Sequence, residues 1–81
     1  MPYIEKMGRS ALDRGSKQPG TSGELTYKLY RESLEYSKRK GKSFSTYCEV
    51  MGSLACTALE FYRRVVAEHE EVKRKLNGDV E

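Results

Sequence analysis

Two pairs of glutamates are the first residues of this chain whose type and spacing could do chemistry. Glu32 with Glu35, and Glu68 with Glu71, stand three positions apart. Residues three apart on a helix lie on the same face, so each pair would present two carboxylates together. Carboxylate oxygens are ligands that Mg²⁺ prefers. Two such helices facing each other would indicate a metal-dependent enzyme.

The same glutamates are also explained by ion pairs on a solvated helix surface. Their spacing is similar to that of the magnesium-binding helices of all-α nucleotide pyrophosphohydrolases, but basic residues stand four positions away and can pair with the carboxylates. The basic residues are Lys28, Arg31 and Arg39 in the first segment and Lys75 in the second, where Arg74 also stands four positions after Glu70. We therefore expect no metal site, no cofactor and no catalytic residue, and keep a Mg²⁺-dependent pyrophosphohydrolase as a second alternative.

The single histidine and the two cysteines do not form a catalytic or metal-binding group. His69 lacks a second titratable neighbour and lies at the edge of an apolar stripe, so we expect a partly buried, hydrogen-bonded side chain. Cys48 and Cys56 lie on one expected helix with their Cα atoms about 12 Å apart, whereas a disulfide needs about 7 Å or less. Both cysteines are interpreted as small core or interface residues.

Basic residues give a binding function more support. Arg63 and Arg64 stand beside Tyr62, on the side of the expected helix away from its apolar stripe, with only Glu60 to pair with them. Guanidinium groups bind phosphate through two parallel hydrogen bonds, and a tyrosine ring offers a surface for a nucleobase. A second basic group ends the first long helix, where the helix dipole also favours lysines. The expected ligand-binding residues are Arg63, Arg64, Tyr62, Lys38, Arg39, Lys40 and Lys42.

The composition limits the size of the core and the cellular location. The chain has 81 residues, of which 33% are charged and 37% hydrophobic, and a formal net charge of +3. A chain this short forms one domain and is near the size at which a partner subunit completes the core. The charge permits anionic partners without indicating nucleic-acid binding by itself. No run approaches about 20 apolar residues and the start lacks the apolar core of a signal peptide, so we expect a cytoplasmic protein without membrane contact.

Three segments are predicted from the positions of apolar and turn-forming residues. Residues 1–14 predict a short helix, with Pro2 in its first turn and Gly15 at its end. Residues 15–22 are rich in glycine and serine and predict a flexible linker. Residues 23–78 predict the compact domain.

The first long helix of that domain is predicted at residues 23–39. Thr21 can cap its free N–H groups, Glu24 can complete a capping box, and Gly41 would end it. Its uncharged side covers roughly 200° of the circumference, more than the roughly 100° stripe of a simple surface helix. A single partner helix would not cover that side. Its large residues are Leu25, Tyr27, Leu29, Tyr30, Leu34 and Tyr36.

The second long helix is predicted to start after a cap at Ser43, Ser45 or Thr46 and to end at Asn77 or Gly78. It would cover about 30 residues, or about 45 Å. The two long helices predict an all-α fold, an antiparallel helical hairpin with a short N-terminal helix. An apolar stripe follows the second helix at three- and four-residue spacing, through Tyr47, Val50, Met51, Leu54, Ala58, Phe61, Tyr62, Val65, Val72 and Leu76.

Apolar surface that a hairpin would leave in water predicts that copies of the chain assemble. Gly52, Ser53 and Cys56 form a patch of small side chains opposite the stripe. This patch is either a poorly optimised part of the helix or a place where a helix of another subunit crosses closely. The expected residues of a homo-oligomer interface are Tyr27, Tyr30, Leu34, Gly52, Ser53, Cys56, Val72 and Leu76.

Four stretches of the sequence resemble a family of small uncharacterised proteins of bacteriophages and prophages. They are MPYI at the start, GELTYKL in the first long helix, YCEVMGSLACTALEFYRRVVA in the second, and NGDV at the end. The family usually has a proline where this chain has Glu68, and a proline there would break the helix near residue 67. One helix or two therefore follow Leu59. The resemblance implies a phage origin and no assigned activity.

The expected function is that of a small, oligomeric, phage-type binding protein without catalytic activity. It would interfere with a host system, such as a defence system, by sequestering a nucleotide-type anion or by occluding a host protein. The alternative is a nucleic-acid-binding accessory or regulatory protein that uses the same basic residues. The salt dependence of the affinity distinguishes the two functions. Duplex binding weakens about tenfold or more over a fourfold rise in salt when several phosphates are neutralised, whereas a packed protein interface responds weakly. No recognition helix of a helix-turn-helix is evident.

Overall fold

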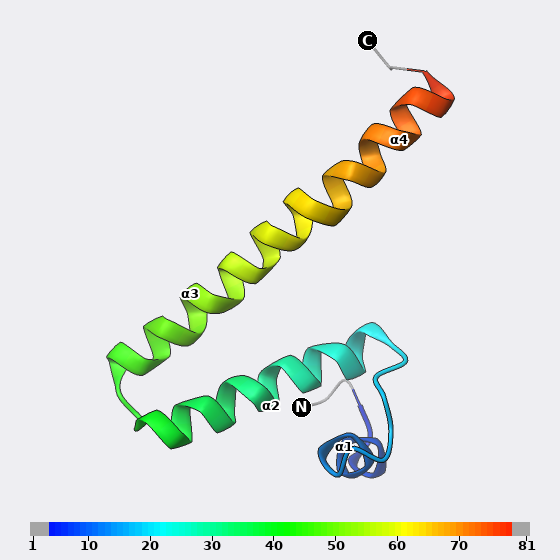
Figure 1. Cartoon of the computed structure of the whole chain (residues 1–81). Coiled ribbons are helices and arrows are strands. Elements are labelled where there is room, and N and C mark those ends of the chain that lie inside the picture. The colour runs from blue at the N-terminus through cyan, green and yellow to red at the C-terminus, as the bar shows by residue number, and fades with distance from the viewer. Residues whose placement is uncertain (1–3, 79–81) are drawn as a thin grey trace. The chain divides into compact units, whose positions relative to one another are not determined.

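A computed structural model describes residues 4–78, and within that range the chain forms helices and no strand. The elements are α1 (Lys6–Asp13), α2 (Ser22–Lys40), α3 (Phe44–Phe61), the π-helical segment η1 (Tyr62–Val66) and α4 (Ala67–Asn77) (Figure 1). The predicted all-α class is confirmed. The chain divides into two compact units, Met1–Tyr47 and Cys48–Glu81. The hairpin and the oligomer stay predictions.

The short helix α1 lies inside the predicted 1–14 segment and ends where glycine was expected to end it. The N–H of Gly15 donates to Leu12 O at 3.1 Å, and that of Ser16 donates to Ala11 O at 3.1 Å. Gly15 has a φ of +74°, the left-handed conformation that closes a helix in this motif. Pro2, expected in the first turn, lies outside the described residues.

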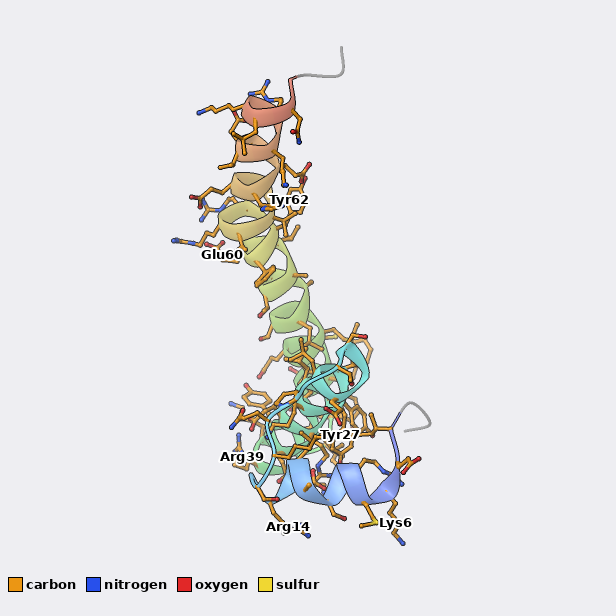
Figure 2. The ribbon with its side chains drawn as sticks, turned by 90° about the vertical axis from the view of Figure 1, so that its right-hand side faces the viewer. Lys6, Arg14, Tyr27, Arg39, Glu60 and Tyr62 are labelled. Atoms are coloured by element: carbon orange, nitrogen blue, oxygen red, sulfur yellow. The ribbon has the colours of Figure 1, made fainter. Side chains whose placement is uncertain are left out.

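The first unit has a small core between α1 and α2. Leu12 of α1 is fully buried and Tyr27 of α2 is 5% exposed. The Tyr27 hydroxyl lies 2.9 Å from both carboxylate oxygens of Asp13, to which it donates (Figure 2). Burial, and then this hydrogen bond, raise the pKa of Tyr27. Tyr27, which was expected at a subunit interface, is thus buried within the first unit.

The start of α2 is capped as predicted, and the glutamate of the capping box has further partners. The N–H of Glu24 donates to Thr21 Oγ1 at 3.1 Å. The buried Glu24 carboxylate accepts from the N–H of Gly20 at 2.8 Å and from Lys17 Nζ at 2.5 Å. These bonds tie the predicted linker to α2, so α1 and α2 belong to one unit. The Lys17 hydrogen bond, followed by that of Gly20, lowers the pKa of Glu24.

The glycines and the serine at the ends of the two long helices begin or end these helices as predicted. Gly41, with a φ of +105°, caps α2 at its C-terminus. The N–H of Thr46 then donates to Ser43 Oγ at 3.2 Å, which identifies Ser43 among the three candidate caps. Gly78, with a φ of +81°, follows the last residue of α4.

The second unit is one continuous helical run from Cys48 to Asn77, formed by the rest of α3, by η1 and by α4. The helix continues past Glu68, which answers the question that the sequence left open. None of the residues of η1 and α4 is buried. Cys48, Cys56 and His69 are exposed, so the core interpretation of the cysteines and the expected partial burial of the histidine are wrong for the single chain. The interface interpretation of the cysteines stays a prediction.

Candidate functional site

The π-helical segment η1 is the irregular feature of the second unit. Its sequence is YRRVV, and the N–H of Ala67 donates to Tyr62 O, five residues back instead of four. Such a turn holds one extra residue, and π segments inside α-helices are frequent at functional sites. One residue corresponds to about 100° of rotation. The extra residue therefore turns α4 by about that angle relative to the phase that α3 would continue.

Both arginines of η1 bind the same carboxylate oxygen. Arg63 Nη2 donates to Glu60 Oε1 at 2.7 Å, and Arg64 Nε donates to the same atom. The two guanidinium groups, that of Arg64 first, lower the pKa of Glu60. The side chains of Arg63 and Arg64 are 67% and 70% exposed. Two positive charges face one negative charge, which leaves a positive charge and several N–H donors open to solvent.

Tyr62 connects η1 to α4. Its hydroxyl donates to Glu70 Oε1 at 2.8 Å, and this bond raises the pKa of Tyr62. Residues eight apart on a regular α-helix lie about 80° out of line, and the extra residue of η1 brings them back into line. The Tyr62 side chain stays 53% exposed, so its ring is accessible beside the arginines.

The remaining predicted ligand residues lie in the first unit. Lys38 is near Glu35, with Nζ 3.9 Å from Oε1. The structure thus brings Tyr62, Arg63 and Arg64 together at η1, while the other basic residues belong to the first unit. That group, at the end of α2 and the start of the following turn, consists of the exposed residues Lys38, Arg39, Lys40 and Lys42.

One glutamate of each pair considered as magnesium ligands has an arginine partner. Arg31 Nη2 donates to Glu35 Oε1 at 2.9 Å, and Arg74 Nη2 donates to Glu71 Oε1 at 2.5 Å. Among residues 4–78, no group of three or more His, Cys, Asp or Glu side chains is placed to hold a metal ion. The arrangement of these carboxylates is that of helix-surface ion pairs.

A family model described as "Domain of unknown function (DUF6899)" matches residues 1–80. The chain belongs to the DUF6899 family. No curated protein and no solved structure matches it. Within residues 4–78 of this DUF6899 chain, no helix combines the length and the apolar character that crossing a bilayer requires.

The other interface residues predicted for the DUF6899 chain are accessible to different extents. Tyr30 is 46% exposed and Leu34 is half-buried in the first unit. Around Gly52 an added Cβ would meet no atom within 4 Å, so the patch of small side chains faces open space. The exposed residues of the second unit in this set are Gly52, Ser53, Cys56, Val72 and Leu76.

Sequence reasoning missed η1 and the role of Glu70. The apolar residues before and after η1 keep α-helical spacing, so the sequence carries no signal for an extra residue in the turn. As a consequence, the single stripe predicted for the second helix is wrong. The turn at η1 moves Val72 and Leu76 by about 100° from the line of Met51 and Leu54.

Proposed function

We propose that this chain is a non-catalytic binding protein that takes an anionic group, in the first place a phosphate, on Arg63 and Arg64. The observation that carries the proposal is that both guanidinium groups share one oxygen of Glu60 while each is at least two-thirds exposed. A single carboxylate neutralises half of their charge. The other half is available to a ligand.

The chemistry of the pair fits a phosphate better than a simple halide. Each guanidinium is a planar fork of donors that matches two phosphate oxygens. Tyr62 presents an exposed ring beside the pair, on which a base can stack. A nucleotide-type anion satisfies both features, with its phosphate on the arginines and its base on the ring.

The binding protein is proposed to work as an assembly of copies. The part of the second unit from Met51 to Val65 has every side chain exposed, including Leu59 at 71% and Phe61 at 59%. A lone helix gains most of its stability from packing of an apolar face. Apolar surface of this extent therefore supports self-association or a protein partner. On the sequence resemblance alone, a host protein or nucleotide signal stays the expected target.

Nucleic-acid binding is the second candidate, and the exposed basic group at the end of α2 favours it. Duplex binding through Lys38, Arg39, Lys40 and Lys42 would release counterions, so it would weaken steeply with salt. A pocket for one phosphate depends less on salt, because fewer phosphates are neutralised.

Calorimetric titration with pyrophosphate and with ADP tests the proposal. The double variant Arg63→Ala/Arg64→Ala should bind at least about tenfold more weakly, because the donors of both forks are lost. The matched control, Arg74→Ala/Lys75→Ala, removes the same charge from the regular helix α4 and should bind as the parent does. Equal weakening of both variants would indicate general charge attraction, and no binding by the parent protein would refute the proposal.

A further inference from the structure

The second unit carries a short seam of apolar residues with coiled-coil spacing. Met51, Leu54, Ala58 and Phe61 follow one another at intervals of three, four and three residues, and Val65 comes four residues later. This is the alternation of the a and d positions that pack between paired helices. All five are exposed, Met51 at 67% and Phe61 at 59% among them. We call these five residues the seam.

The positions beside the seam carry no charge over most of its length. Residues 50–59 include no Asp, Glu, Lys or Arg on any side of the helix. Charged residues flanking a seam normally select the partner by attraction or repulsion. Since such residues are missing between Glu49 and Glu60, an identical helix can lie against this one without bringing like charges together. The seam therefore accepts a second copy of the chain.

The exposed area is of the size that a pair of copies needs. Met51, Leu54, Phe61 and Val65 are 37–67% exposed. At on the order of 100 Å² each they contribute about 400 Å², and the uncharged flanks extend this toward the about 800 Å² per partner of a standard interface. The length of the seam, about 21 Å for 14 steps of the helix, is enough for two heptads.

We propose that two copies of this chain pair through the seam, with Met51, Leu54, Ala58, Phe61 and Val65 of one copy packed against those of the other. The proposal rests on the assembly in the proposed function and deepens it by naming the face and the occupant. The patch of Gly52, Ser53 and Cys56, expected earlier at an interface, lies on the opposite side of α3, about 120–180° away from the centre of the seam. It is left in solvent.

The π-helical segment η1 sets the end of this contact. The π turn begins after Phe61 and contains Val65, and its extra residue turns Val72 and Leu76 out of the line of the seam. Arg63 and Glu60 lie on the side away from the seam, as their positions on the helical wheel show. Pairing therefore leaves Arg63 and Glu60 uncovered, whereas Arg64 borders the seam residues Phe61 and Val65.

Sedimentation equilibrium of the full chain over a wide concentration range tests the pairing with two matched substitutions. Leu54→Lys places a charge in the seam, whereas Leu59→Lys places the same charge about 120° away from its centre. Lysine is a good helix former, so both variants should keep the parent's circular dichroism. We expect a dimer for the parent and for Leu59→Lys, and a dissociation constant at least tenfold higher for Leu54→Lys.

Labelling of Cys56 with a maleimide, in a Cys48→Ser background, gives an independent reading. Cys56 is exposed in the single chain and faces away from the seam, so its labelling rate should be the same below and above the dimerisation concentration. Slower labelling in the dimer would place the interface on the small-residue patch and overturn the proposal. A parent chain that stays monomeric, or equal effects of the two lysine substitutions, would also overturn it.

Pyrophosphate titration of the same samples separates this proposal from the proposed function. A monomeric parent chain that still binds pyrophosphate through Arg63 and Arg64 would refute pairing and leave anion binding standing. A dimer that fails to bind pyrophosphate would refute anion binding and leave the seam standing.

Discussion

The hydroxyl of Tyr62 donates a hydrogen bond of 2.8 Å to Glu70 Oε1, eight residues further along the chain. The bond joins η1 to α4 across the extra residue of the π turn. The bond depends on the change of helical phase at η1, because a regular helix would hold these two residues about 80° out of line. The same change of phase separates the seam from Val72 and Leu76.

The alkaline titration of Tyr62 should report this bond. Because Glu70 holds the proton on the hydroxyl, the pKa of Tyr62 lies above its ordinary value of 10.0. The bond therefore stabilises the folded chain below pH 10, and that contribution is lost as the pH rises through the raised pKa. Replacing Glu70→Gln removes the charge and should bring the ionisation back toward 10.0. Tyrosinate absorbance of the two proteins measures the shift, with Tyr62→Phe to identify the signal. Identical curves for Glu70→Gln and the parent would show that the bond does not form in solution.

Deleting Val66 should convert η1 into a regular α-helical turn. The deletion removes the extra residue together with the wide turn that accommodates it, so Val72 and Leu76 keep their direction relative to the seam. Helical content should be kept, and the dimer dissociation constant should stay close to that of the parent. The control deletion of Thr57, inside the regular part of α3, puts the two halves of the seam out of register and should raise that constant. Sedimentation equilibrium distinguishes the cases, and a constant raised as much by the Val66 deletion as by the Thr57 deletion would contradict the phase argument.

Stability in acid should depend on Glu24. Hydrogen bonds from Lys17 and Gly20 lower the pKa of this carboxyl below its ordinary value of 4.5. A lowered pKa in the folded state contributes stability above pH 4.5, and this stability is lost as the pH falls through the folded pKa. Glu24→Gln should therefore be less stable than the parent at pH 7, and the difference in melting temperature should shrink in acid. A difference that is the same at pH 7 and in acid would contradict the role of the ionised carboxylate.

The packing of α1 on α2 should depend on Leu12. It is the fully buried large side chain of the described residues, so Leu12→Ala should cost about 2–5 kcal/mol of unfolding free energy in the first unit. Met7, on the same helix, is 84% exposed, and Met7→Ala should change that free energy by no more than about 0.5 kcal/mol. Hydrogen exchange of the α1 amides measures both. Equal protection in the two variants would show that Leu12 does not hold α1 in place.

The sequence by itself determined the ends of the helices. Thr21 and Ser43 cap helices because their hydroxyls accept from backbone N–H groups three residues later. Gly15 and Gly41 end helices because glycine takes positive φ values without strain. These effects act within a few residues, so the local sequence is enough to predict them. The pairing of Arg63 and Arg64 with Glu60 is local in the same sense.

Only the tertiary structure decided how α1 packs on α2. Only the course of the backbone revealed the π turn of η1. Tyr27 is spaced like any residue of the uncharged side of α2. Its hydroxyl nevertheless donates to Asp13, fourteen positions away in the same unit. A partner so far along the chain leaves no trace in helical periodicity. The extra residue of η1 likewise leaves the apolar spacing unchanged, because a pattern of side chains does not record which carbonyl each N–H selects. For that reason the sequence predicted that the arginines lie away from the apolar stripe, but not that Val72 and Leu76 are turned out of its line.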